Sequence, residues 1–111
     1  MKVEWERHGD ATAVAVITGS LNALTATELE GELIPVAREA KVTRLVLDLS
    51  GVAMVSSAGL RVLLTAIKEM RAHSGEVCMA GLGAANRKIF EMVGFFNFSR
   101  ECASVADALD G

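Results

Sequence analysis

Two adjacent serines, Ser56 and Ser57, are the residues of this sequence best placed for chemistry, because a predicted helix begins at Ser57. The first backbone N–H groups of a helix have no partner within it, and the helix dipole favours negative charge there. A phosphate on a hydroxyl at this position would therefore be held by the fold. The stretch predicts a phosphorylatable switch on a small binding domain, although a serine at a helix start can also be only an N-cap.

Catalytic arrangements around these serines are sparse. Residues 55–59 (VSSAG) differ from the G-x-S-x-G elbow of hydrolases, because Val55 stands where that motif has its first glycine. Asp48 could act as a catalytic acid or could accept turn N–H groups as an Asx cap. No nucleophile–base pair, carboxylate pair or metal set is visible, so we predict a protein that is not an enzyme and carries no cofactor.

The histidines and cysteines are predicted to be structural. His8 and His73 have no companions at metal-ligand spacing, and Cys78 and Cys102 do not form a CxxC pattern. Cys78 falls within an apolar strand, where a thiol serves as a small core residue. We predict neither a disulfide nor a metal site.

Residues 81–86 (GLGAAN) follow a short apolar segment and superficially resemble the start of a dinucleotide fingerprint. The third glycine of that fingerprint is replaced by Asn86, and the segment lies late in the chain. An ordinary strand-to-helix turn is the better account, because two glycines often serve backbone geometry alone.

Composition predicts a single globular domain over residues 1–111. Hydrophobic residues make up 51% and charged residues 23%, and the net charge of −3 argues against a nucleic-acid-binding protein. No apolar run approaches about 20 residues, and the first residues lack the apolar core of a signal peptide. We therefore expect a cytoplasmic protein with no membrane contact.

The first half of the chain predicts a hairpin and a helix. Residues 2–7 alternate like a half-buried strand, and residues 13–18 supply its partner. Thr25 and Glu28 have the spacing of a capping box, so a helix is expected to run from there to about Ala40. Its predicted inner face holds Leu29, Leu33, Val36 and Ala40, and Pro35 predicts a kink or a broken turn.

The middle of the chain predicts a buried parallel strand over residues 42–49 and a helix over 57–72, joined by a short turn. Gly75 is suited to a left-handed position after that helix, and residues 76–80 form another strand.

The last third predicts a helix over residues 86–93 closed by Gly94 and a terminal helix over residues 103–110 with Ser104 as its N-cap. Three phenylalanines between these helices are predicted to anchor a last strand, and the less favoured alternative is a surface aromatic patch: Phe95, Phe96 and Phe98. The element order indicates an α/β domain with a mixed sheet of four to five strands and about four helices.

Residues 48–64 (DLSGVAMVSSAGLRVLL) resemble the signature of STAS domains, in particular of bacterial anti-sigma factor antagonists. Residues 19–29 (GSLNALTATEL) resemble the family's segment before its first helix, and residues 87–95 (RKIFEMVGF) resemble its third helix. The resemblance covers nearly the whole chain. It implies a small mixed sheet with helices packed largely on one face.

The resemblance also implies partner switching. In that family, the unphosphorylated antagonist binds an anti-sigma factor, which is an ATP-binding, histidine-kinase-like serine kinase, and thereby releases its target. A PP2C-type phosphatase reverses the phosphorylation, and related modules control secretion, biofilm formation and motility. The alternative within the family is a non-phosphorylated STAS scaffold, such as a subunit of a lipid-transport ABC system.

By position in the family's motif, the phosphorylated serine falls on Ser57, with Ser56 as a second candidate. The family often has acidic residues where this chain has Ser56 and Asn22, so negative charge is reduced near the acceptor. Arg61 could pair with an acidic group of the partner or be a solvated helix residue. The predicted partner surface comprises Asn22, Met54, Val55, Ser56, Ser57, Ala58, Gly59, Leu60 and Arg61.

Overall fold

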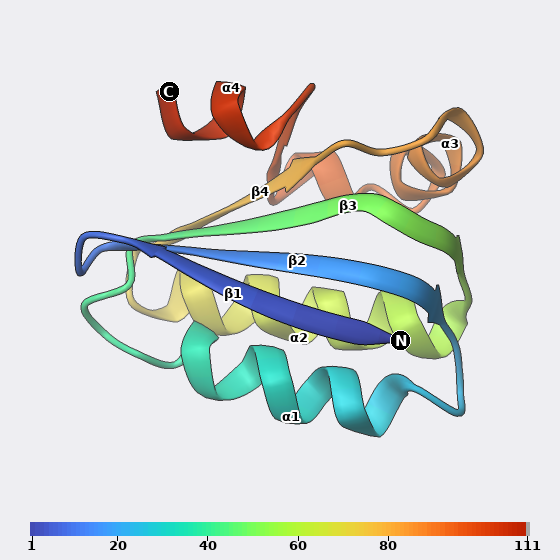
Figure 1. Cartoon of the computed structure of the whole chain (residues 1–111), viewed down its shortest axis with the longest axis horizontal. Helices are drawn as coiled ribbons and strands as arrows, with labels where there is room; N and C mark the ends of the chain where they lie inside the picture. Colours follow the sequence, from blue (N-terminus) through green and yellow to red (C-terminus); the bar gives the residue numbers. More distant parts are fainter. Residues whose placement is uncertain (111) are drawn as a thin grey trace.

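The protein was analysed as a computed structural model that describes residues 1–110 (Figure 1). Gly111, the last residue of the predicted domain, lies outside the described residues. The elements in chain order are β1 (Lys2–His8), β2 (Thr12–Leu21), α1 (Ala26–Ala37), β3 (Arg44–Val55), α2 (Ser57–Ala72), β4 (Glu76–Ala80), α3 (Ala84–Met92), the 3-10 helix η1 (Phe95–Asn97), β5 (Arg100–Cys102) and α4 (Val105–Asp110).

The strands form one mixed sheet in the order β1-β2-β3-β4-β5. β1 pairs antiparallel with β2, while β2, β3, β4 and β5 pair in parallel. Helices α1 and α2 lie side by side under one face, and α4 lies on the other (Figure 1). This confirms the predicted α/β class, the mixed sheet and the N-terminal hairpin.

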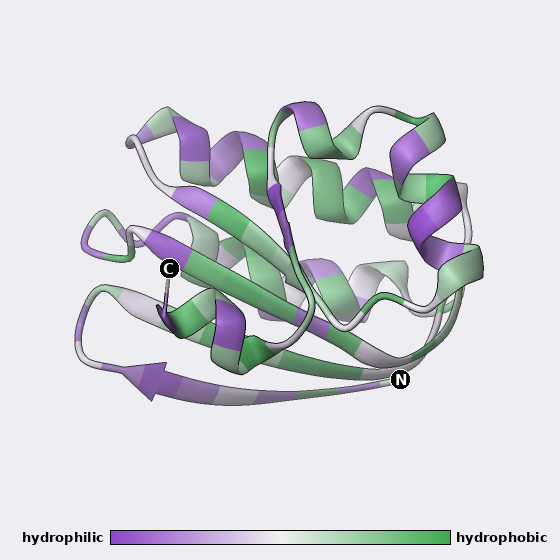
Figure 2. Ribbon diagram, turned by 90° about the horizontal axis from the view of Figure 1, so that it is seen from above, coloured by the Kyte–Doolittle hydropathy of each residue, from purple (hydrophilic) through white to green (hydrophobic). Residues whose placement is uncertain are grey.

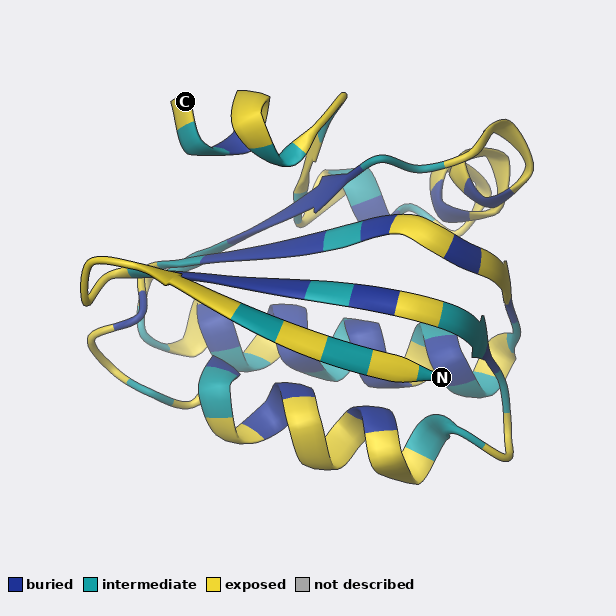
Figure 3. Cartoon of the chain, viewed as in Figure 1, coloured by how far each residue is buried: buried dark blue, intermediate teal, exposed yellow. Residues whose placement is uncertain are grey.

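The two kinds of strand differ in burial as their sequences predict. Along β1, the half-buried Val3 and Trp5 alternate with exposed residues (Figure 3). The first halves of β2 and β3 are buried on both faces, and Figure 2 shows their residues as mostly hydrophobic. A strand that is covered on both faces needs apolar side chains on both, whereas an edge strand needs them on one.

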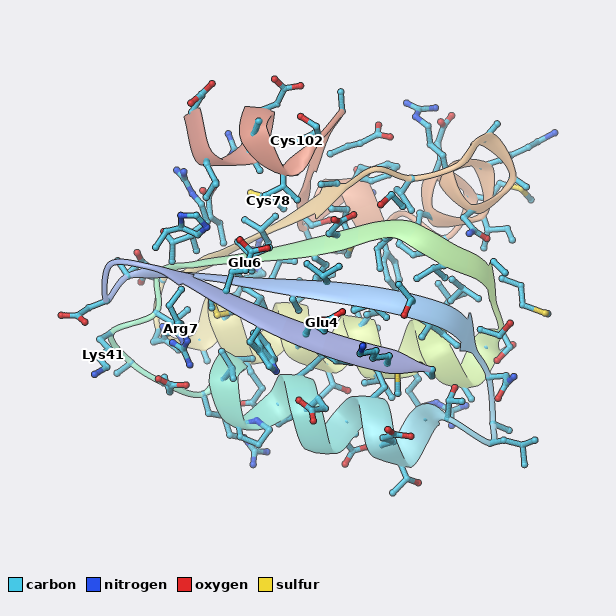
Figure 4. All side chains as sticks on the ribbon, in the orientation of Figure 1. Glu4, Glu6, Arg7, Lys41, Cys78 and Cys102 are labelled. Carbon is cyan, nitrogen blue, oxygen red and sulfur yellow. The ribbon has the colours of Figure 1, made fainter. Side chains whose placement is uncertain are left out.

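The main core lies between the sheet and α1, α2 and α3, and a smaller cluster lies under α4. In the smaller cluster, Ala108 of α4 packs with Val14, Val46 and Cys78. Cys78 and Cys102 lie beneath α4 on neighbouring strands, and both thiols are free (Figure 4). Burial raises the pKa of the Cys78 thiol, which is consistent with its predicted role as a core residue.

None of the helices formed by residues 1–110 combines the length and the hydropathy needed to cross a bilayer.

Strands β2 and β3 are longer than predicted, and this changes the surroundings of the serines. The connector expected after Thr18 continues as strand to Leu21, and the turn expected after Leu49 continues as strand to Val55. The residues of these extensions are mostly polar or small, so the sequence pattern does not mark them as strand. Their pairing is also irregular, with register shifts after Val16 and Gly19. The tip of β3 is largely exposed (Figure 3).

The predicted capping box at the start of α1 is wrong. Thr25 precedes the helix but makes no side-chain cap to it. Its hydroxyl instead donates to the Ser20 carbonyl at 2.9 Å and accepts the Asn22 N–H at 3.0 Å. The helix also continues without a break through Pro35 and ends at Ala37, earlier than expected, with Ile34 rather than Val36 buried.

Two further expectations about single residues fail. Ser74, with φ of 67°, occupies the left-handed position that we assigned to Gly75. Phe98 is 50% exposed, whereas Phe95 is buried as predicted. Gly94, with φ of 79°, does occupy a left-handed position after α3.

Replacing Phe90 should destabilise the protein strongly, because its fully buried ring packs against Phe95 with centroids 5.2 Å apart. We expect Phe90→Ala to lower the free energy of unfolding by about 3–5 kcal/mol. The matched control, Phe98→Ala, should cost less than about 1 kcal/mol because that ring is half exposed. Urea unfolding measures both, and equal losses would contradict the assignment of the core.

Candidate functional site

The candidate site lies at the carboxyl ends of β2 and β3, where α2 begins. Leu21 and Val55 are paired at the ends of these strands, and Ser56 alone separates β3 from α2. The Ser56 N–H donates to the Leu21 carbonyl at 2.8 Å, so the strand pairing extends to the helix start. The position of the helix start is therefore fixed by the sheet.

Ser57 is the first residue of α2 and is exposed. Within residues 1–110, the N–H groups of Ser57, Ala58 and Gly59 have no acceptor, while the Leu60 N–H bonds to the Ser56 carbonyl at 2.9 Å. The first turn of α2 contains no acidic side chain that would compete for these N–H groups. A negative group on the Ser57 hydroxyl would therefore be favoured by the helix end.

Ser56 is in a different environment from Ser57. It has an extended backbone, with φ of −94° and ψ of 177°, and occupies the N-cap position. Its hydroxyl oxygen is buried, has no hydrogen-bond partner within residues 1–110 and makes no side-chain cap. A kinase must reach an exposed hydroxyl, so accessibility distinguishes the two serines in favour of Ser57.

Asn22 organises the loop between β2 and α1, which lies next to the start of α2. Its side-chain oxygen accepts the Leu24 N–H at 2.9 Å and the Thr25 N–H at 3.2 Å, and its carbonyl accepts the Ala26 N–H at 2.9 Å. An aspartate could accept the same bonds, so asparagine keeps the loop geometry without adding charge.

Leu24 was missed by sequence reasoning. This loop holds it outward with 93% of its surface exposed, and Met54 at the tip of β3 is 53% exposed. The two residues provide apolar surface at the carboxyl ends of β2 and β3, near the start of α2. The sequence signal that could have indicated its exposure is an apolar residue in a segment otherwise made of loop and capping residues.

Val55 and Gly59 do not belong to the surface to which we assigned them. Val55 is only 6% exposed, and Gly59, in the first turn of α2, is buried. A β-carbon added at Gly59 would lie 2.8 Å from both the Cβ and the carbonyl oxygen of Leu21. The glycine therefore permits close packing within the chain rather than close approach by a partner.

Asp48 has a structural role. Its Oδ1 accepts the Ser50 N–H at 3.1 Å and the Ser50 hydroxyl at 2.8 Å. Gly81, with φ of 72°, passes directly beside this pair. Of the two roles considered, the contacts match the Asx-type acceptor.

The 81–86 segment is a strand-to-helix turn. Buried Asn86 donates its side-chain N–H to the Val52 carbonyl at 3.1 Å and so ties α3 to the tip of β3.

The two histidines lie apart from this region. The His73 ring contacts the Ala37 carbonyl at 2.9 Å, and His8 lies beside Glu6. Within residues 1–110, no three His, Cys, Asp or Glu side chains are grouped as a metal site would require.

A hollow of about 340 Å³ opens beside Ser57, between α2 and the segment that follows α3. It is lined by Ser57, Leu60, Arg61, Leu64, Val93 and Phe95. The Arg61 guanidinium makes no ion pair with any described residue and lies one helical turn after Ser57. Val93, which is 51% exposed, was not predicted to belong here, because sequence spacing does not show which helices lie side by side.

Residues 2–108 match the STAS domain family. A Bordetella bronchiseptica protein named as an anti-sigma factor antagonist, BtrV, is 36% identical over 102 residues, covering 87% of each chain. An anti-sigma factor antagonist from Mycobacterium paratuberculosis has a similar structure, with a TM-score of 0.86, 25% identity and coverage of 98% of this chain and 91% of that one. The phosphorylated form of Bacillus SpoIIAA shares the fold at a TM-score of 0.77 and 17% identity, with coverage of 98% and 97%.

Replacing Gly59 should loosen the contact between α2 and β2. We expect Gly59→Ala to lower the free energy of unfolding by about 1–3 kcal/mol, because the added methyl group collides with Leu21 backbone atoms. The control is Gly31→Ala on the exposed face of α1, where a β-carbon meets nothing within 4 Å. That change should stabilise the helix by about 0.5–1 kcal/mol. Thermal or urea unfolding tests the pair, and a neutral Gly59→Ala would contradict the packing argument.

Proposed function

The chain belongs to the STAS domain family, and we propose that it is an anti-sigma factor antagonist controlled by phosphorylation of Ser57. The unphosphorylated form binds an anti-sigma factor that is also an ATP-binding, histidine-kinase-like serine kinase, and this binding releases the kinase's target. A PP2C-type phosphatase restores the binding form. The chain itself acts as a binding protein and not as a catalyst.

The observation that carries this proposal is the position of Ser57. Ser57 is an exposed residue at the first position of a helix whose first N–H groups have no acceptor within the described residues, while the neighbouring Ser56 hydroxyl is buried. The relatives that match the chain at 36% and 25% identity are named as anti-sigma factor antagonists, which supports the same role here.

The proposed contact surface surrounds this hydroxyl. It consists of residues that the fold leaves at least partly accessible: Asn22, Leu24, Met54, Ser57, Ala58, Leu60 and Arg61. The exposed Leu24 and Met54 side chains supply apolar contact area, and flexible methionine adapts to an irregular partner. Ser56 contributes through its backbone position rather than through its hydroxyl.

Phosphorylation changes the charge of this surface without requiring the fold to change. A phosphate on Ser57 adds a charge of about −1.5 to −2 at neutral pH. Burying such a group against a partner that offers no cation costs several kcal/mol, which weakens binding by orders of magnitude. The helix end favours the charge in the free chain, so the modified protein stays folded.

Asn22 and Ser56 make phosphate addition easier than acidic residues would. Both positions lie at the start of α2 or in the loop beside it, and neither carries a negative charge that would repel the phosphate. Asn22 still accepts the bonds that hold its loop.

Substitutions at Ser57 test the switch. We expect Ser57→Ala to bind the kinase like the wild type and Ser57→Asp to bind at least about tenfold more weakly, because a carboxylate then occupies the contact surface. Ser56→Ala is the matched control and should still accept phosphate. Calorimetric titration measures the affinities, and intact-mass analysis after incubation with ATP and the kinase measures phosphate addition.

Equal affinities of Ser57→Ala and Ser57→Asp would contradict a charge switch. Phosphate found on Ser56, or still added to Ser57→Ala, would show that Ser57 is not the phosphate acceptor. A chain that acquires no phosphate from its kinase or in cells would instead support the non-phosphorylated STAS scaffold.

A further inference from the structure

The hollow beside Ser57 continues along α2. A second hollow of about 220 Å³ is lined by Leu64, Ile67, Lys68, Arg71 and Phe98. Leu64 lines both hollows, so they lie next to each other along α2, opposite Val93, Phe95 and Phe98, and the two together are named the groove. From Ser57 to Arg71 the helix rises by about 21 Å, at about 1.5 Å per residue, which is the length of a four-turn helix.

The walls of this groove are apolar and accessible. Phe98 is 50% exposed and Val93 is 51% exposed, and Met92 just before them is 77% exposed. Half of the large hydrophobic side chains that are exposed in the described chain thus fall within seven consecutive residues, 92–98. Two of them, Val93 and Phe98, line the hollows, and exposed apolar side chains at such hollows favour an interaction surface.

The rim of the groove is positively charged. Arg61, Lys68 and Arg71 all lie on the groove side of α2, and none of the residues that line either hollow is acidic. Within residues 1–110, Arg61 and Lys68 make no ion pair, and Arg71 makes only a cation–π contact, 5.5 Å from the Phe98 ring centroid. Three cations without carboxylate partners are notable in a chain whose net charge is −3.

The other arginines of the helices differ in this respect. Arg38, the C-cap residue of α1, pairs with Glu69 at 3.2 Å, and Arg87 of α3 pairs with Glu101 at 2.8 Å. Glu69, the acidic residue of α2, is thereby directed to α1 and away from the groove. The groove side of α2 therefore lacks the local charge compensation found on its neighbours.

We propose that this groove binds an acidic amphipathic helix of the partner protein. Apolar residues of that helix pack on Leu64, Val93 and Phe98, and its carboxylates pair with Arg61, Lys68 and Arg71. Arg61 and Lys68 are seven residues apart, so carboxylates two turns apart along the partner helix reach both. The inference rests on the proposed function only in taking the partner to be the anti-sigma factor kinase.

The groove gives the phosphate a second effect. Ser57 lines the same hollow as Arg61, which lies four residues further along one face of α2. A phosphate on Ser57 places negative charge at one end of the basic rim and competes for the Arg61 guanidinium. It therefore repels an acidic helix in addition to being costly to bury.

A designed peptide tests the groove without using the kinase. The probe is a helical peptide of about 15 residues, with leucines at helical spacing and glutamates beside them, and its counterpart carries lysine in place of glutamate. When the acidic peptide is titrated into the ¹⁵N-labelled chain, the amide signals of α2 and of residues 92–98 should shift. We expect the lysine counterpart to bind at least about tenfold more weakly.

Two variants locate the interaction. Lys68→Glu and Phe98→Ser change exposed residues, and each should weaken binding of the acidic peptide by at least about fivefold. Lys41→Glu, the same charge change on the α1–β3 loop, should leave it unchanged. Equal binding of the two peptides, shifts on another face, or equal affinities of Lys68→Glu and Lys41→Glu would overturn the proposal.

The same variants separate this inference from the proposed function. If Ser57→Asp loses kinase binding while Lys68→Glu binds like Lys41→Glu, the groove does not receive the kinase and the switch still stands. If Ser57→Asp binds like Ser57→Ala while the acidic peptide still occupies the groove, the switch fails and the groove remains.

Discussion

The contact between the end of β2 and the start of α2 is the constraint on which the site depends. The Leu21 carbonyl accepts the Ser56 N–H at 2.8 Å, and Gly59 brings the first turn of α2 against the same residue. These two contacts fix the helix start relative to the sheet. Ser57 is consequently exposed at the end of a rigid element, with the loop around Asn22 beside it.

This rigidity suits a protein that signals by charge rather than by shape. In the proposed switch the phosphate is added where the helix end already favours negative charge, so the modification would alter the surface potential and not the core. The groove along α2 extends the same logic. In our proposal the basic rim attracts an acidic partner, and a phosphate at one end of that rim opposes this attraction. Under this proposal, a small domain exchanges partners without unfolding or moving an element.

The sequence predicted the fold well where the periodic pattern is strong. The bounds of α2 and β4 are as expected, because amphipathic spacing and a short apolar run marked them. The ends of β2 and β3 were missed because their small and polar residues resemble a loop, and only pairing with the neighbouring strand shows them to be strand. Thr25 failed as a cap because its hydroxyl finds a partner in Ser20, which lies outside the local motif.

The candidate site was predicted in part. Ser57 and the start of α2 followed from the motif, but a linear sequence does not reveal which residues between 54 and 61 face inward. Val55 and Gly59 are buried, and the Ser56 hydroxyl is enclosed. Leu24, Val93 and Phe98 are exposed apolar residues, and their exposure follows from tertiary packing that the sequence does not show.

The most direct test of the central claim is a binding titration on one sample in two states. The chain is phosphorylated on Ser57 by its kinase, titrated with that kinase, and titrated again after a PP2C-type phosphatase has removed the phosphate. The account predicts weak binding before dephosphorylation and full affinity afterwards, with the unfolding transition little changed between the two states. Equal affinity in both states would contradict it.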